Sequence, residues 1–208
     1  MKPGTNSNHP EPGRCITAEP IRRREDIDAI RGLLAANPRN RCLFELGIHT
    51  NLRIGDLLAL TVGRVAHLRP GDVLPVRQQK RGKFGLRTLN NGAYEALQRW
   101  LVVHPEYMPQ HCLWGNFDAA VFPGKDGHSP ITVPYASRLV KSWCHAIGLT
   151  GNYSAHSLRK TFGYHAINTF GARVEVVSAA FGHRDVATTL LYLGIQEADV
   201  KGLFMNEL

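Results

Sequence analysis

Apolar residues recur at helical spacing through most of this chain, and this pattern constrains its fold more than any other feature. Between Arg23 and Ala36, for example, Ile27, Ile30 and Leu33 follow one another at intervals of three residues. Comparable patterns predict further helices around residues 42–48, 52–60, 93–103, after Thr132, 156–169, 173–181, 185–192 and 196–206. The chain is therefore predicted to be mainly helical.

The middle of the chain changes to the pattern of short strands. Val65–Leu68, Val73–Gln79 and Phe84–Leu89 are short apolar runs separated by turn signals at Pro70-Gly71 and Arg81-Gly82. These runs predict a small antiparallel sheet, so the expected class is mainly α (α+β), a helical bundle with a small antiparallel β-sheet. Residues 1–19 are rich in Pro, Gly and Asn and predict a flexible tail before one domain over residues 20–208.

Charge and composition narrow the possible partners. Lys and Arg outnumber Asp and Glu by 25 to 17, which gives a net charge of +8 and favours a polyanionic partner such as nucleic acid. There is no apolar run of the roughly 20 residues needed to cross a bilayer, and the N-terminus lacks the apolar core of a secretory signal. The four cysteines are scattered without a C-x-x-C pair. We therefore expect a soluble, cytoplasmic protein without a disulfide framework or metal site.

Three motifs supply the groups that phosphodiester chemistry needs, namely a nucleophile, cations for the non-bridging oxygens and proton donors and acceptors. The first is "IHTNLRIGDLLAL" with Arg53, and the second is "HSLRKTF", in which His156 and Arg159 lie three residues apart on one helix face. The third is "FGHRDVATTLLY", with His183 beside a helix start and Tyr192 nine residues later. Arginine suits phosphate because its planar fork donates two parallel hydrogen bonds.

In this order the motifs resemble the tyrosine recombinases, or phage integrases, from about residue 20 to the end of the chain. The resemblance implies that residues 20–208 form the catalytic domain of a site-specific recombinase or integrase. Tyr192 would attack the scissile phosphate and form a 3′-phosphotyrosyl link, while Arg53 and Arg159 hold the non-bridging oxygens. His156 would help to take the tyrosyl proton and His183 would hydrogen-bond the phosphate.

The resemblance also implies a hairpin lysine that protonates the departing 5′-oxygen. Lys80 is preferred because it precedes the turn, with Lys83 as the rival, and Asp56 resembles the acidic residue that braces the site. Contacts to the DNA backbone are expected from Arg81, Lys160 and Arg184.

Double-stranded DNA is the expected partner, bound by a homo-oligomer such as a tetramer whose subunits can be monomeric in solution. The stored phosphotyrosyl bond removes the need for a cofactor or metal, and the sequence has neither a phosphate-binding G-x-x-x-x-G-K-[ST] loop nor a carboxylate cluster for Mg²⁺. Most relatives carry an N-terminal domain before this region, so a minimal member or a fragment is expected. Two alternatives stay open: a catalytically silent DNA-binding accessory protein, and a relaxase similar to type IB topoisomerases.

Overall fold

The computed structural model describes residues 17–75, 87–106 and 116–194, and most of these residues are helical. The helices of the described residues are α1 (Arg24–Leu33), α2 (Pro38–His49), α3 (Ile54–Leu58), α4 (Val62–Val65), α5 (Asn91–Val102), α6 (Val133–Ala146), α7 (Ala155–Asn168), α8 (Val174–Phe181) and α9 (Val186–Leu193). This confirms the mainly helical class. The helix predicted over residues 196–206 lies outside the described residues.

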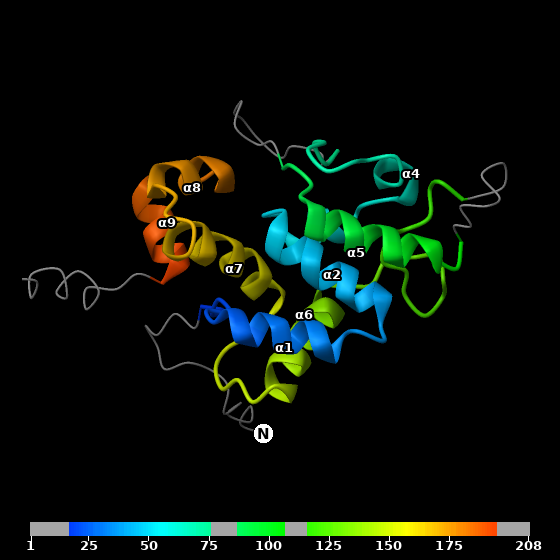
Figure 1. Cartoon of the computed structure of the whole chain (residues 1–208), viewed down its shortest axis with the longest axis horizontal. Helices are drawn as coiled ribbons and strands as arrows, with labels where there is room; N and C mark the ends of the chain where they lie inside the picture. Colours follow the sequence, from blue (N-terminus) through cyan, green and yellow to red (C-terminus); the bar gives the residue numbers. More distant parts are fainter. Residues whose placement is uncertain (1–16, 76–86, 107–115, 195–208) are drawn as a thin grey trace, which may run out of the picture.

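Helix α2 lies at the centre of the molecule, with α5 on one side and α7 on the other (Figure 1). The sequence starts this helix with Pro38 in its first turn and with Asn37 as the cap, whose side chain accepts a hydrogen bond from the amide of Asn40 at 3.1 Å. Every residue from Cys42 to Ile48 is buried, as expected of a helix that is covered on all sides. Helix α6 also packs against α7.

Gly47 allows α2 and α7 to approach closely. A Cβ atom at this position would come within 2.5 Å of a methyl carbon of Leu158 on α7. Phe44 of α2 also packs edge-on against Trp143 of α6, with ring centroids 6.1 Å apart. These contacts belong to one continuous apolar core that spans α1 to α6 and the inner face of α7.

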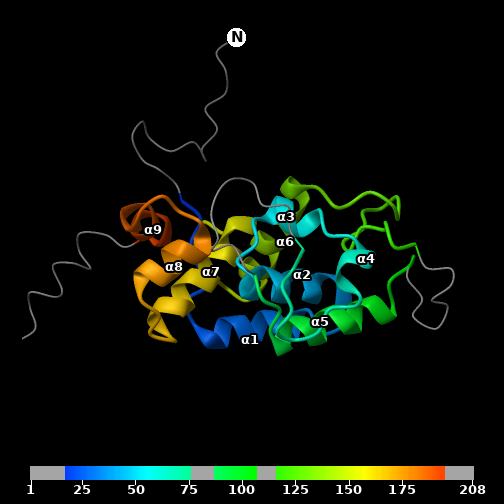
Figure 2. The same ribbon diagram turned by 90° about the horizontal axis from the view of Figure 1, so that it is seen from above.

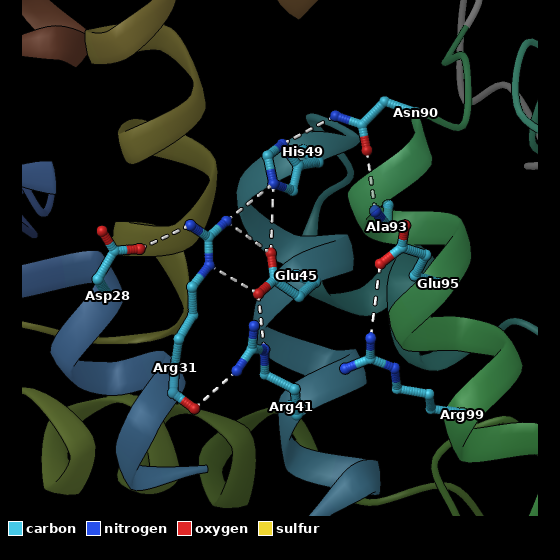
Figure 3. A network of polar contacts seen from close by, with 9 residues as sticks. All are labelled: Asp28, Arg31, Arg41, Glu45, His49, Asn90, Ala93, Glu95 and Arg99. Carbon is cyan, nitrogen blue, oxygen red and sulfur yellow. Dashed lines mark hydrogen bonds and ion pairs between the residues drawn. The ribbon is translucent and has the colours of Figure 1, made fainter. Parts of the chain in front are cut away.

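A buried carboxylate ties α1 to α2 (Figure 3). Glu45 is only 2% exposed and accepts hydrogen bonds from Arg31 at 2.9 and 3.0 Å and from Arg41 at 2.7 Å. Burial alone would raise the pKa of Glu45, but hydrogen bonds from His49 and Arg31 and the charges of Arg31 and Arg41 lower it to about 2. Glu45 is therefore ionised at neutral pH and fully paired.

The described residues do not confirm the predicted small antiparallel sheet. The described residues contain isolated antiparallel bridges, Thr61 with Ala120, Val73 with Thr88, and Pro123 with Pro130, in place of continuous strands. The strand predicted over residues 65–68 is wrong, because Val62 and Val65 point into the core from the short helix α4. In a run of four residues, apolar spacing does not separate a strand from one helical turn. Residues 76–86, which include the predicted hairpin turn, lie outside the described residues.

A second, smaller core lies at one end of the molecule, where α8 and α9 pack on α7 (Figures 1 and 2). Its buried members are Val177, Phe181 and Leu193, and Phe162 and Tyr192 pack against them. Gly163 of α7 makes this contact possible, because a Cβ atom there would lie 2.5 Å from Phe181 and 2.7 Å from Leu193. Helix α7 is therefore covered by the main core on one face and by the smaller core on the other.

Hydrogen bonds join the first described residues, before α1, to α7. The amide of Ile21 donates a hydrogen bond to Thr161 at 2.9 Å, and its carbonyl lies 3.0 Å from Nε2 of His165. Glu19, which the sequence places in the flexible tail, donates its amide to the carbonyl of Asn152 at 2.8 Å. Among the described helices, none is long and apolar enough to cross a membrane.

Candidate active site

Helix α7 carries three cationic or titratable side chains near its start. A capping box between Ser154 and Ser157 begins the helix immediately before His156. His156 is exposed, whereas Arg159 and Lys160 are only 4% and 3% exposed. The expected spacing of His156 and Arg159 by one turn of a single helix is therefore confirmed, with Arg159 deeper in the protein.

Arg159 is held by two backbone carbonyls from different parts of the fold. Nη1 donates to the carbonyl of Asn51 at 2.9 Å, and Nη2 donates to the carbonyl of Phe181 at 2.9 Å. Its guanidinium carbon lies 5.0 Å from the centre of the Phe181 ring. Two of the five N–H donors of the guanidinium make these bonds, so the group is fixed while further donors are left for a ligand.

Burial lowers the pKa of Arg159 to about 10, and the charges of Arg53 and Arg87 act in the same direction. Tyr192 and Asp56 have the opposite effect on this pKa. Arg159 is therefore still a cation at neutral pH. The mutual effects also show that these five side chains share one electrostatic environment.

The segment that carries Arg53 is shaped by Asn51. Asn51 is the only residue other than glycine with a positive φ in the described part of the chain, at 55°. Its side-chain amide donates to the carbonyl of Ala180 at 2.7 Å, which joins this segment to the end of α8. Arg53 follows as the exposed N-cap residue of α3, and Asp56 lies half-buried in the first turn of that helix.

His183 follows the left-handed Gly182 that ends α8. Its Nδ1 lies 2.9 Å from the hydroxyl of Thr189, so Nε2 is the nitrogen that would meet a ligand. Burial lowers the pKa of His183, and the charges of Arg159 and Arg53 lower it further. The imidazole is therefore neutral at physiological pH.

Tyr192 lies on α9, whose start is capped by Asp185. Its ring packs edge-on against the rings of Phe181 and His183, with both centroid distances 5.3 Å. Burial raises the pKa of the Tyr192 phenol, while the charges of Arg159 and Arg53 and a side-chain contact with Arg159 act against this rise. The phenol predicted as nucleophile therefore contacts Arg159, and the charge of Arg53 also acts on it.

Four predicted site residues remain, of which the structure describes only Arg184. Lys80, Arg81 and Lys83 lie outside the described residues, and Arg184 is exposed in the turn before α9. Lys160, which is predicted to contact the DNA backbone, has a buried side chain whose Nζ lies 4.9 Å from the centre of the Tyr192 ring. Nothing in the sequence around Lys160 indicates that its side chain is buried against the ring of Tyr192.

Sequence reasoning missed two members of the site. Asn51 had a weak signal, since asparagine tolerates a left-handed backbone and this one follows a helix end. Arg87, next to the bridge between Val73 and Thr88, gave no signal. Burial lowers the pKa of Arg87, with Asp56 opposing and Arg53 reinforcing that change.

The site thus combines a half-buried phenol, at least two guanidinium groups and a neutral imidazole, drawn from the segment before α3, from α7 and α9, and from the turn between α8 and α9. Guanidinium groups bind phosphate oxygens, and a phenol beside them is placed to act as a nucleophile toward that phosphate.

Comparison with known proteins agrees with this chemistry. Residues 24–198 match the model of the phage integrase family, and the chain belongs to this family. Tyrosine recombinase XerD of Caulobacter vibrioides is 31% identical over 196 residues, which cover 88% of this chain and 62% of that protein. For XerD of Shewanella oneidensis the identity is 29%, with 79% of this chain and 52% of that protein covered. The chain thus spans only part of the length of these relatives.

Solved structures show the same fold. The crystal structure of XerA recombinase matches with a TM-score of 0.69 at 15% identity, over 94% of this chain and 68% of that one. XerH recombinase bound to its palindromic difH substrate in a post-cleavage complex gives 0.65 at 21% identity, over 86% of this chain and 49% of that one. A lambda integrase dimer bound to a COC′ core site matches with a TM-score of 0.58 at 16% identity, over 88% of this chain and 51% of that one.

Proposed function

We propose that this chain is the catalytic part of a site-specific DNA recombinase or integrase that cleaves and rejoins double-stranded DNA. The observation that carries the proposal is the contact of Tyr192 with His183 and Arg159, at a place where the charge of Arg53 also acts on the phenol. The family match and the XerD relatives support the reaction class. The XerH structure with its difH substrate supports DNA as the ligand.

In the cleavage step, Oη of Tyr192 attacks the phosphorus of the scissile phosphodiester. The bond from phosphorus to the 5′-oxygen breaks, which leaves a 3′-phosphotyrosyl link and a free 5′-hydroxyl. Arg53 and Arg159 bind the non-bridging oxygens, where negative charge grows in the transition state. His156 accepts the phenol proton, and His183 donates a hydrogen bond to the phosphate through Nε2.

The departing 5′-oxygen takes a proton from Lys80, with Lys83 as the alternative donor. Both lysines lie outside the described residues, and the antiparallel bridge of Val73 with Thr88 flanks the segment that contains them. Asp56 braces the arginines by its charge. Rejoining is the reverse step, in which a 5′-hydroxyl attacks the phosphotyrosyl bond, so the chain needs neither a cofactor nor a metal to reseal the strand.

DNA binding is proposed to use residues 20–208 as one catalytic domain, with backbone contacts from Arg81 and Arg184. The exposed position of Arg184 supports such a contact. Assembly as a homo-oligomer, a tetramer on paired sites, would bring two duplexes together for strand exchange. The lambda integrase dimer on a core site supports assembly on DNA.

The test is the capture of a covalent adduct. The chain is incubated with a pool of random-sequence duplexes that carry nicks, denatured with detergent, and examined for DNA that migrates with the protein. Sequencing of the attached strands then identifies the cleavage site. The wild type is expected to form adducts, and Tyr192→Phe is expected to form none while its DNA affinity, measured by fluorescence anisotropy, stays within about twofold because one hydroxyl is removed.

Each other outcome has a definite meaning. DNA binding without an adduct in the wild type would indicate the silent accessory protein and overturn the proposal. Adducts that persist in Tyr192→Phe would overturn the assignment of the nucleophile. Relaxation of supercoiled plasmids of any sequence would instead indicate a relaxase similar to type IB topoisomerases.

A further inference from the structure

Lys160 is a buried cation that the reaction described above does not use. It is 3% exposed, follows Arg159 directly on α7, and places Nζ 4.9 Å from the centre of the Tyr192 ring. A lysine is rarely buried to this degree, because removing its charge from water is costly unless other groups compensate. The electron-rich face of Tyr192 is one such group.

We propose that Lys160 is a positioning residue for the nucleophile, whose ammonium holds the Tyr192 ring in place and stabilises the phenolate that forms as the proton leaves. This inference rests on the proposed function and deepens it. Among the described residues, the charged and titratable groups that face Tyr192 are Lys160 and Arg159 from α7, Arg53 from the segment before α3, and His183 from the turn before α9. His183 is the neutral member of this set, so the three cations determine how easily the phenol ionises.

The bound phosphate changes the balance among these cations. Arg53 and Arg159 bind the non-bridging oxygens in the proposed complex, so the phosphate's negative charge compensates their influence on the phenol. Lys160 contacts the ring from α7 and is not assigned to the phosphate. The charge of Lys160 therefore continues to favour the Tyr192 phenolate at the moment of attack, whereas burial of the phenolate disfavours it.

The experiment compares Lys160→Met with Lys160→Arg and with the control Lys141→Met. Lys141 is exposed on α6, so its replacement removes one positive charge without touching the site. Single-turnover adduct formation is measured from pH 6 to about 9.5 on the nicked substrate identified above. For Lys160→Met we expect a pH profile displaced upward by about one unit and a rate about tenfold lower at neutral pH, since one pKa unit corresponds to tenfold in ionisation.

Lys160→Arg keeps the cation and should restore the wild-type pH profile, and Lys141→Met should match the wild type in pH profile. A Lys160→Met variant that is slower by the same factor at every pH would show a purely structural role and overturn the inference. Thermal melting checks that the variants fold. If Lys160→Met does not fold, the pH profile of adduct formation is measured for Lys160→Gln instead.

A second measurement does not depend on DNA. Protein labelled with fluorotyrosine is titrated by ¹⁹F NMR, and the Tyr192 resonance is identified by its absence in Tyr192→Phe. We expect the phenol of residue 192 to ionise at higher pH in Lys160→Met than in the wild type, and an unchanged titration would overturn the inference. A wild type that forms no adduct but shows this displacement would reject the proposed function while supporting the contact of Lys160 with Tyr192.

Discussion

At the scale of single residues, Asn51 connects several parts of the candidate site. Its carbonyl accepts from Arg159, its amide donates to Ala180, and it precedes Arg53 by two positions. Its left-handed backbone turns the chain from the end of α2 toward α3. The conformation of this one residue therefore helps to position both arginines that are proposed to bind phosphate.

The backbone of Asn51 can be tested with two variants that both remove the side-chain amide. Asn51→Gly tolerates a φ of 55°, whereas Asn51→Ala adds a Cβ that disfavours it. We expect Asn51→Ala to be less stable than Asn51→Gly by about 1 to 2 kcal/mol, the ordinary cost of a left-handed residue. Urea unfolding measures the difference. Equal free energies of unfolding for the two variants would contradict this account.

At the scale of elements, the helices were largely predictable because their ends carry local signals. Thr132 and Pro134 begin α6, Asp185 caps α9, and Gly182 ends α8 with a left-handed backbone. The predicted segments around residues 93–103 and 173–181 correspond to α5 and α8. The strand over residues 65–68 failed because only tertiary packing decides such short apolar runs.

The candidate site residues were predicted from ordered motifs. The structure places Tyr192 in contact with His183 and Arg159, and the catalytic roles of Arg53, Arg159, His183 and Tyr192 stay predictions. The buried state of Lys160 could not be found from spacing, because α7 is covered on two faces by two different cores. A side chain that a single amphipathic helix would expose is therefore enclosed here.

Gly163 provides the element-scale test, since its missing side chain sets the distance from α7 to α8 and α9. Gly163→Ala would place a methyl group against Phe181 and Leu193, so we expect α9 to move away and adduct formation to fall at least tenfold. Gly32→Ala is the matched control, because a Cβ on α1 at that position meets no atom within 4 Å. The control should keep wild-type adduct formation and unfold at a slightly higher urea concentration, as helix propensity favours alanine by up to about 1 kcal/mol.

Comparison of the two variants separates packing from helix propensity. Both add the same methyl group to a helix, and only one of them adds it at a close contact between helices. Wild-type adduct formation by Gly163→Ala would show that the close approach of α7 to the smaller core is not needed to place the nucleophile.

At the scale of the whole molecule, the candidate site lies where the main core and the smaller core meet on α7. The main core holds α2, α3 and the inner face of α7, whereas Tyr192 packs in the smaller core of Val177, Phe181 and Leu193. Local stability follows the buried apolar area that an element shares with the rest of the protein. The part that carries Tyr192 is therefore expected to open at a lower free energy than the rest.

Hydrogen exchange of the free protein tests this division. We expect the amides of α9 to exchange at least about tenfold faster than those of α2, which is buried from Cys42 to Ile48. Phe181→Ala should remove about 3 to 5 kcal/mol of packing from the smaller core, the usual cost of such a truncation. Protection should then vanish in α8 and α9 while α2 keeps its slow exchange. Loss of protection in α2 to the same extent would show that the two cores unfold as one unit, and that the nucleophile is carried by the most stable part of the fold after all.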